Sequence, residues 1–400
     1  MTKKKKSVDW RTLKPGTTSV WAGELEQFPY GATQVPVVHG VTFAYDDVDA
    51  WMKVALGQQE GHIYSRNTNP TVSVFEEKIR ILEGAEAATS FATGMAAISN
   101  TLFTLLSPGQ RVVSIKDTYG GTSKIFLEFL PRFGVEVMLC DTEDHEKIER
   151  EVSKGCQVLY LETPTNPTLK ILDLERLSHA GASAGATVVV DNTFATPINQ
   201  NPLALGADLV VTSATKFLGG HSDAMGGAVC GSKNLIQRIF HFREITGASL
   251  HPMSAYLLLR GMKTLELRVH RQGESALELA RFLEQHPKID RVFYPGLESH
   301  TGHEIARRQM RSFGGILSFS LKGASANVNA FLERLKFVHL AASLGSVGTL
   351  AGPPKTTSHV ETSEQERREL GIPENLIRYS VGIENVEDLK ADLESALAGL

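Results

Sequence analysis

The 400-residue chain contains few cysteines and no apolar run that approaches the ~18 residues of a membrane span. Its three cysteines, Cys140, Cys156 and Cys230, are far apart and form no C-x-x-C pair. This usage argues against a disulfide framework or a zinc site and indicates a reducing compartment. The basic start, residues 1–7, is not followed by an apolar stretch, so we do not interpret it as a signal peptide. We expect a cytoplasmic protein with no membrane partner.

The chain also has no excess of positively charged residues. The formal net charge is −4, which argues against a general nucleic-acid-binding protein. His300 and His303 have the spacing of a metal pair, but no third ligand is nearby, so we assign no metal. Hydrophobic residues make up 42% and charged residues 22% of the chain, as in ordinary globular proteins. A single core seldom grows to this length, so we expect more than one domain.

The pattern of the chain predicts three parts. Residues 1–62 show little periodicity and read as an N-terminal arm that lies on a neighbouring subunit. Residues 63–255 alternate short apolar runs with helical stretches, which predicts right-handed βαβ units and a largely parallel sheet. A long helical stretch over 254–286 leads into a smaller α/β domain, residues 256–400. The expected strands of the larger domain are Arg111–Lys116, Val158–Glu162, Thr187–Asp191, Leu209–Ser213 and Gly227–Cys230.

Polar residues follow several of these strands at their carboxyl ends. Tyr119 comes after the first strand, residues 163–166 follow the second, Asp191 ends the third, and residues 213–216 follow the fourth. Ligands of open parallel sheets bind beyond this edge. We therefore expect these side chains to converge on one site.

Lys216 and Asp191 indicate which ligand this edge binds. A lysine after a hydroxyl-rich turn suits pyridoxal 5′-phosphate (PLP), because its amine forms a Schiff base with the aldehyde. A carboxylate at the end of another strand suits the pyridine nitrogen of the same cofactor. Ser213 and Thr215 would supply hydroxyls to the phosphate. Taken alone, the Ser-Ala-Thr-Lys run that ends at Lys216 favours PLP only modestly over a surface lysine after a buried strand.

Four further features fit the same site, each beside a plainer interpretation. Gly94 opens a helical segment whose amides suit a phosphate, or it is simply a tight helix entry. Tyr119 stacks on a ring, or packs half-buried. Tyr64 and Arg66 suit a phosphate, or lie in an exposed loop. Arg378 sits within an apolar strand and either binds an anion or faces solvent.

Together these residues resemble a known family, the Cys/Met-metabolism PLP-dependent (trans-sulfuration) enzymes of fold type I. The resemblance runs from about residue 15 to the end. It is carried by Tyr-Ser-Arg-x-x-Asn-Pro-Thr, Gly-Met-x-Ala-Ile, Tyr-Gly-Gly-Thr, Glu-Thr-Pro-x-Asn-Pro, Val-Asp-Asn-Thr-Phe, Ser-Ala-Thr-Lys-Phe and Arg-x-Ser-Val-Gly-Ile-Glu. It implies an α/β fold with a mostly parallel sheet of the seven-stranded type, flanked by helices, and a smaller C-terminal α/β domain. It also implies a homotetramer whose active sites are shared between subunits.

The resemblance also implies roles for individual residues. Lys216 binds the cofactor and moves protons, Asp191 pairs with the pyridine nitrogen, and Tyr119 stacks on the ring. The cofactor phosphate is bound by Gly94, Met95, Ser213 and Thr215. Tyr64 and Arg66 reach the phosphate of a neighbouring subunit. The substrate α-carboxylate is bound by Arg378, Asn166 and Ser343.

Members of this family differ in the group that leaves the γ or β carbon. Cystathionine-acting members usually carry acidic residues where this chain has Ile63 and Ala342, so the distal ammonium of cystathionine would lack a partner here. Lys124, where those members carry arginine, is left to bind a distal carboxylate such as succinyl. The loop 346–355 departs from the family pattern.

We therefore expect γ-replacement on an O-acylated homoserine, with γ-elimination from cystathionine, methionine or another γ-substituted amino acid as the alternative. A non-catalytic PLP or amino-acid-binding relative is a more remote possibility.

Overall fold

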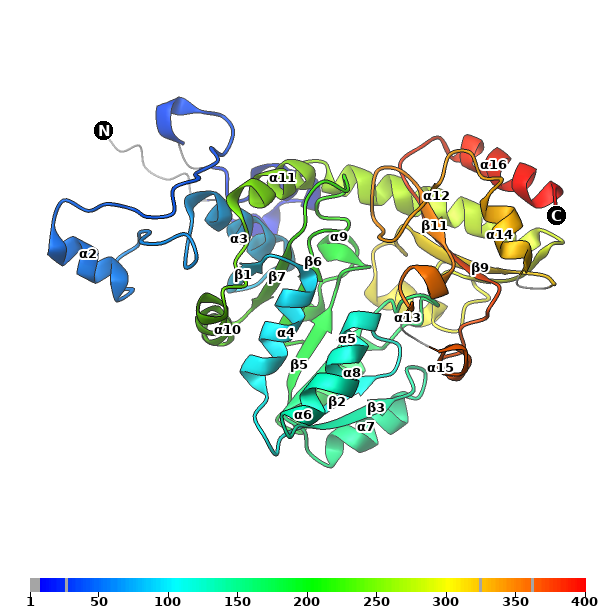
Figure 1. Cartoon of the computed structure of the whole chain (residues 1–400), viewed down its shortest axis with the longest axis horizontal. Helices are drawn as coiled ribbons and strands as arrows, with labels where there is room; N and C mark the ends of the chain where they lie inside the picture. The colour runs from blue at the N-terminus through cyan, green and yellow to red at the C-terminus, as the bar shows by residue number, and fades with distance from the viewer. Residues whose placement is uncertain (1–7, 26–27, 324–325, 361–362) are drawn as a thin grey trace.

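The computed structural model describes residues 8–25, 28–323, 326–360 and 363–400, and it contains two β-sheets flanked by helices (Figure 1). The strands are β1 (Ala87–Phe91), β2 (Arg111–Ile115), β3 (Glu136–Cys140), β4 (Val158–Glu162), β5 (Thr187–Asp191), β6 (Leu209–Ser213), β7 (Gly227–Gly231), β8 (Ile289–Phe293), β9 (Ile316–Leu321), β10 (His339–Leu340), β11 (Leu350–Gly352) and β12 (Leu376–Ser380). In the described part of the chain, no helix is both long and apolar enough to cross a bilayer.

The helices are α1 (Pro15–Trp21), α2 (Val48–Ala55), α3 (Pro70–Glu83), α4 (Gly94–Leu105), α5 (Gly120–Lys124), α6 (Leu130–Arg132), α7 (His145–Ser153), α8 (Leu174–Ser183), α9 (Thr196–Asn199), α10 (Lys233–Thr246), α11 (Pro252–Met262), α12 (Leu265–Gln285), α13 (His303–Gln309), α14 (Ala326–Leu332), α15 (Glu364–Glu369) and α16 (Val386–Ala398). Short 3₁₀ turns are η1 (Trp10–Thr12), η2 (Pro29–Gly31), η4 (Pro202–Leu205) and η5 (Pro354–Thr356), and η3 (Ile125–Phe129) is a π-helix.

The larger sheet has seven strands in the order β1-β7-β6-β5-β4-β2-β3. The strands β6, β5, β4, β2 and β3 run parallel to one another, and β7 is antiparallel to both of its neighbours. The prediction of an α/β fold with a largely parallel sheet is therefore confirmed. All five expected strands are present, within one residue at their ends.

Alternating side chains of these strands pack against two helical layers. Tyr160 and Val189 belong to the core cluster that includes α4 and α10, whereas Leu161 and Val190 belong to the cluster that includes α7 and α8. Both faces are covered, which explains the nearly continuous apolar composition of the strands. Glu162 and Asp191, two residues beyond Tyr160 and Val189, therefore project toward the α4 side.

The second sheet has five strands in the order β10-β11-β12-β9-β8, and α12, α14 and α16 pack against it in a separate core cluster. The helix α16 begins at Val386 behind Asn385, whose side chain accepts a hydrogen bond from the Glu387 backbone. The long helical stretch expected over residues 254–286 is confirmed. It is two helices, α11 and α12, interrupted at Lys263 and Thr264.

The helix α3 has clear signals at both of its ends in the sequence. The Asn69 side chain accepts hydrogen bonds from the backbones of Thr71 and Val72, Pro70 occupies the first turn, and Gly84 ends the helix with a φ of 71°. Asn69 satisfies amides that lack intrahelical partners, and glycine adopts a positive φ without a steric penalty.

The N-terminal arm has more structure than its sequence indicates. Two of its segments are helices, and Pro15 and Pro29 begin a helix and a 3₁₀ turn. In Figure 1 the part that carries α2 extends away from the rest of the chain, and α2 buries none of its residues. The apolar residues Val48, Trp51, Met52 and Leu56 are at least half exposed.

The first part of the arm is held by a buried ion-pair cluster. Glu24 Oε1 lies 2.9 Å from Lys78 Nζ of α3, and Glu24 Oε2 lies 2.5 Å from Lys263 Nζ at the break between α11 and α12. Lys78 also donates to the carbonyl oxygens of Ser19 and Val20, at 2.7 and 3.0 Å. The arm is thus tied to the point where the two sheet regions join.

Candidate active site

A cavity of about 330 Å³ lies at the carboxyl edge of the large sheet and extends to the second sheet. The residues that line it are Thr93, Gly94, Met95, Ile98, Tyr119, Glu162, Asn166, Asp191, Thr193, Phe194, Ser213, Thr215, Lys216, Met225, Ala342, Ser343, Leu344, Thr357, Ser358 and Arg378. The convergence expected from the strand ends is therefore present. Ten of the thirteen residues selected from the sequence line this one cavity: Gly94, Met95, Tyr119, Asn166, Asp191, Ser213, Thr215, Lys216, Ser343 and Arg378.

Lys216 follows β6, and its side chain enters the cavity. Its Nζ donates a hydrogen bond to Ser343 Oγ at 2.9 Å. Burial, with a smaller contribution from the charge of Arg378, lowers the pKa of Lys216 to about 8. An amine with this pKa is partly neutral near neutral pH, so Lys216 can act as a nucleophile and as a proton carrier. The surface-lysine interpretation does not fit this position.

Asp191 ends β5 and is buried. Its Oδ1 accepts a hydrogen bond from the Thr193 backbone at 2.9 Å, and its Oδ2 accepts one from the Tyr160 hydroxyl at 3.4 Å. Burial raises the pKa of Asp191, while the hydrogen bonds from Thr193 oppose that shift. None of the ion pairs in the described part of the chain includes Asp191. The carboxylate is thus suited to a cation supplied by a ligand.

The opposite end of the cavity has features of a phosphate site. Gly94 begins α4, whose first amides lack intrahelical partners. A Cβ on Gly94 would lie 2.7 Å from the Cβ of Ser213, so only glycine allows these two segments to approach. The Thr215 hydroxyl donates to the Gly226 carbonyl at 3.2 Å and accepts from the Gly226 amide at 3.0 Å.

Arg378 approaches the cavity from β12 and is only 5% exposed, so the buried alternative is the correct one. Its Nη1 donates to Asn166 Oδ1 at 3.0 Å, and its Nη2 donates to the Ser343 carbonyl at 2.9 Å. These acceptors are neutral, and burial lowers the pKa of Arg378 to about 10. A buried guanidinium that lacks a carboxylate partner among the described residues is suited to an anionic ligand.

Tyr119 is 42% exposed and stands at the start of α5. Its backbone amide donates to Glu162 Oε2 at 2.8 Å. Its ring lies over the small Gly121, because a Cβ there would come within 3.0 Å of Tyr119 Cε1 and 2.9 Å of Met95 Sδ. The ring therefore borders the cavity at the end where Met95 also lies.

Three residues selected from the sequence do not line this cavity. Lys124 pairs with Glu128, with 2.9 Å between Nζ and Oε1, on the outer side of α5. Arg66 stacks over the ring of Tyr64, with its Cζ 5.0 Å from the ring centroid. Tyr64 and Arg66 follow directly after the arm, and a role in a second subunit stays a prediction.

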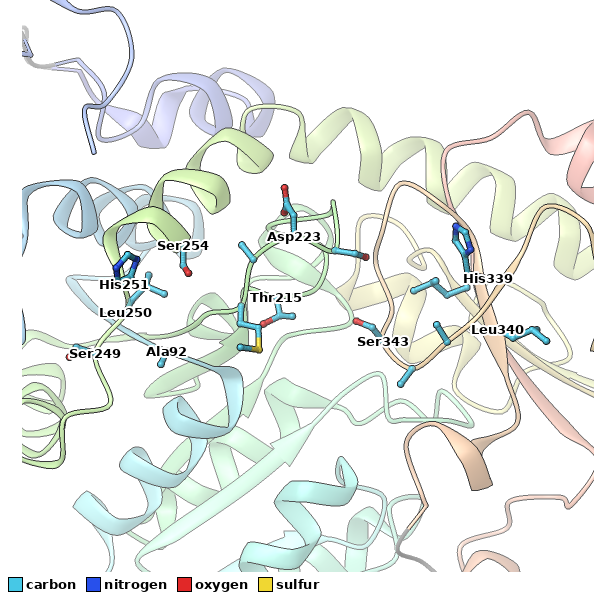
Figure 2. A pocket seen from close by; sticks show the side chains of 16 residues that line it. Ala92, Thr215, Asp223, Ser249, Leu250, His251, Ser254, His339, Leu340 and Ser343 are labelled. Carbon is cyan, nitrogen blue, oxygen red and sulfur yellow. The ribbon is translucent and has the colours of Figure 1, made fainter. Parts of the chain in front are cut away.

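A larger cavity of about 940 Å³ adjoins the first and shares Thr215, Met225, Ala342 and Ser343 with it. Figure 2 shows it between the start of α11, with His251 and Ser254, and the loop that carries His339, Leu340 and Ser343. The shared residues place the two cavities next to each other on the side of Ala342 and Ser343.

Sequence reasoning missed several residues of the site. Glu162, Thr193 and Ser358 line the cavity, and Tyr160 contacts Asp191 from below. For Glu162 a signal was available, because it ends β4 as Asp191 ends β5. Ser358 follows η5, in a part of the chain for which we predicted no structure.

A buried lysine, a phosphate-binding helix start and a carboxylate opposite them define a PLP-dependent enzyme of the α/β class. Residues 16–398 match the family described as Cys/Met metabolism PLP-dependent enzyme. The chain therefore belongs to this family, and its fold is the fold type I that the resemblance implies.

Individual relatives include enzymes with different activities. The chain is 45% identical to an L-methionine gamma-lyase of Fusobacterium nucleatum subsp. polymorphum over 96% of this chain and 97% of that protein. It is 41% identical to a cystathionine gamma-lyase of Bacillus subtilis, over 97% and 100%. A solved structure of a cystathionine gamma synthase from Xanthomonas oryzae pv. oryzae is 36% identical, with a TM-score of 0.92, over 96% of this chain and 98% of that one.

Proposed function

We propose that this enzyme catalyses replacement or elimination at Cγ of an α-amino acid whose γ-substituent carries no charge at its far end. One observation carries the proposal. The buried guanidinium of Arg378 and the amine of Lys216 both contact Ser343, so an α-carboxylate bound by the first lies beside the second. The cavity is also lined by the apolar residues Ala342, Met225 and Leu344.

The residues of the cavity fit the cofactor of the family. The start of α4 with Gly94 and Met95, together with Ser213 and Thr215, would hold the phosphate. Asp191 would pair with the pyridine nitrogen and Tyr119 would cover the ring. Bound PLP would supply an aldehyde for amines and a conjugated ring that draws electron density from the bonds at Cα.

The remaining chemistry is assigned to side chains of the chain itself. Arg378 and Asn166 orient the α-carboxylate through forked hydrogen bonds. Lys216 Nζ removes the proton from Cα, passes that proton on and so returns to the free amine, and then removes one from Cβ; a pKa near 8 allows both forms at neutral pH. The Tyr119 hydroxyl gives a proton to the group that leaves Cγ. Tyr119 lines the cavity and is partly exposed, which supports this assignment.

The far end of the substrate decides between candidate substrates. An acidic side chain at position 342 would hold a distal ammonium, but alanine stands there. Lys124, expected to hold a distal carboxylate, pairs with Glu128 outside the cavity. Neither position therefore supplies a charged partner within the smaller cavity, and a charged end desolvated without a partner costs about 1–3 kcal/mol. Methionine and O-acetylhomoserine suit the cavity better than cystathionine or O-succinylhomoserine.

The relatives support replacement and elimination alike. We retain replacement on an acylated homoserine as the first outcome, since a thiol can reach Cγ through the larger cavity. Elimination, which releases 2-oxobutanoate and ammonia, is the second outcome, and the methionine gamma-lyase and cystathionine gamma-lyase relatives favour it.

The assembly and the location are also part of the proposal. The exposed apolar face of α2 and the projecting arm suit a second copy of the chain, so that Tyr64 and Arg66 would reach the phosphate site of a neighbour within a homotetramer. The three cysteines are free thiols, which supports the cytoplasm as the compartment. We place the domain limits at 1–62, 63–255 and 256–400, because the two sheets lie in the second and third of these ranges.

A substrate panel tests this function. The PLP-loaded enzyme is given methionine, O-acetylhomoserine, O-succinylhomoserine, cystathionine or canavanine, with and without a thiol, and 2-oxobutanoate and thioether products are measured. We expect kcat/KM for the uncharged substituents to exceed that for the charged ones by about tenfold or more. Preference for cystathionine would contradict the proposed cavity chemistry. Absence of both products with every substrate would contradict reaction at Cγ.

A further inference from the structure

Glu162 and Asp191 end two neighbouring parallel strands at the same register. Each is the Cα partner of the other across β4 and β5, and the two are only 4% and 6% exposed. In-register residues of parallel strands project to the same face, and neighbouring strands lie about 4.8 Å apart. Two carboxyl groups therefore share one wall of the cavity.

Nearby positive charges are already committed to other groups. Lys170 Nζ lies 3.1 Å from Asp117 Oδ1. The other carboxylate oxygen of Asp117 accepts a hydrogen bond from the Thr142 hydroxyl. Arg378 donates to Asn166 and Ser343, and Lys216 donates to Ser343. Among the described residues, the ion pairs include neither Glu162 nor Asp191. A single cofactor cation can balance only one of these two acids.

The hydrogen bonds favour Asp191 as the charged member of the pair. It accepts from the Thr193 amide and from the Tyr160 hydroxyl, whereas the hydrogen bond given for Glu162 comes from one amide, that of Tyr119. Burial raises the pKa of Glu162 well above its ordinary value, and the neighbouring charges of Asp191 and Asp117 add to this. Two buried carboxyl groups this close do not both ionise.

The backbone amide that donates to Glu162 belongs to Tyr119, the residue expected to stack on the cofactor ring. Tyr119 is 42% exposed, so packing fixes its side chain only in part. The next residue, Gly120, packs closely against the chain around Ser358, because a Cβ on Gly120 would lie 2.7 Å from the carbonyl oxygen of Ser358. The backbone at this turn is thus held between Glu162 and the chain around Ser358.

We propose that Glu162 is a positioning residue that works in its neutral, protonated form: it anchors the Tyr119 backbone and leaves Asp191 as the one anion of the pair that faces the cofactor ring. The inference rests on the proposed cofactor site. It follows that the function of Glu162 requires the length of its side chain and an acceptor oxygen, but not a negative charge.

Three substitutions separate these properties. Glu162→Gln keeps the length and a carbonyl acceptor without a charge, Glu162→Asp keeps the charge and loses the reach, and Glu162→Ala loses both. For each apoprotein the dissociation constant of PLP is measured by equilibrium dialysis, and the circular dichroism of the bound cofactor reports how the ring is held. Glu146→Gln, an exposed site on α7, serves as the matched control.

We expect Glu162→Gln and the control to stay within about twofold of the wild type in PLP affinity and to keep the dichroic band. We expect Glu162→Asp and Glu162→Ala to lose about tenfold in affinity and most of the band, as for the loss of one buried hydrogen bond. Loss of affinity or of folding in Glu162→Gln would overturn the proposal, because the charge would then be required. Wild-type behaviour of Glu162→Asp would overturn the anchoring role. No amino acid is present, so an error in the proposed substrate class leaves these results unchanged.

Discussion

The two walls of the active-site cavity are built differently. The wall from the large sheet consists of strand ends, with Glu162 and Asp191 in register and buried, and with the half-buried Lys216 just after β6; all three are hydrogen-bonded. The wall from the smaller sheet is a loop that includes the two-residue strand β10, exposed residues 339–342, and Ser343 with a φ of 107°. The sheet wall carries groups that any reaction of this cofactor needs. The loop wall faces the substituent, so it is where selectivity can change at little cost to the fold.

The largest effect is expected on the sheet wall. Replacing Lys216 with alanine removes the amine that moves both protons, and general acid–base catalysis of this kind contributes about 10²–10⁴-fold to rate. We expect turnover to fall by about 10³-fold or more, measured as 2-oxobutanoate or thioether formation. The melting temperature should change little, because the lysine contributes a desolvated amine rather than core packing. Turnover near the wild-type rate would refute the proton-transfer role.

Arg378 connects the two walls, since it bonds Asn166 on one side and Ser343 on the other. In Arg378→Lys the charge remains but the forked geometry is lost. We expect kcat/KM to fall by about 10²-fold, mainly through KM, because charge-assisted hydrogen bonds contribute about 1.5–3 kcal/mol each. A steady-state analysis with each substrate separates KM from kcat. An unchanged KM would show that the α-carboxylate binds elsewhere.

Ala342 allows the loop wall to be changed alone. Placing glutamate there supplies a partner for a distal ammonium, so Ala342→Glu should raise kcat/KM for cystathionine relative to methionine by about tenfold. PLP affinity should stay the same, because the residue faces the shared part of the two cavities rather than the cofactor groups. Ala342→Gln is the matched control without charge. Equal gains in both variants would indicate a steric effect instead of charge pairing.

The smallest effect is expected outside both walls. Lys124 forms a partly exposed pair with Glu128, and such pairs contribute about 0–1 kcal/mol. We expect Lys124→Ala to change kcat/KM for O-succinylhomoserine and O-acetylhomoserine by less than about twofold. A selective loss with the succinyl substrate would restore the role that the sequence suggested for this lysine.

The difference between the two walls also explains which features could be predicted from the sequence. Strands with apolar runs bounded by polar ends, such as Leu209–Ser213, were placed within a residue, and the groups beyond them met as expected. The strands β1 and β3 were missed. Ala87–Phe91 consists largely of small residues, and Glu136–Cys140 is a half-exposed edge strand, so neither shows the composition of a buried strand.

Sequence reasoning failed where tertiary contacts decide the outcome. The burial of Arg378 depends on Asn166, 212 residues away, and on the Ser343 carbonyl. The pairing of Lys124 with Glu128 was readable as an i,i+4 pair, but its position outside the cavity depends on the direction of α5. The helix α2 has a capping Asp47, a local signal that the prolines and glycines elsewhere in the arm obscured.

The carboxylate of Glu24 has a practical consequence for engineering this enzyme. It stands opposite two ammonium groups, and one of them, on Lys78, is completely buried. Removing residues 1–24 would remove the Glu24 carboxylate together with the carbonyl groups of Ser19 and Val20. The buried Lys78 ammonium would then lose the acceptors that hold it. Tags and protease sites placed ahead of Pro15 keep the cluster intact, whereas only a truncation that extends through residue 24 removes all three acceptors that the structure gives to Lys78.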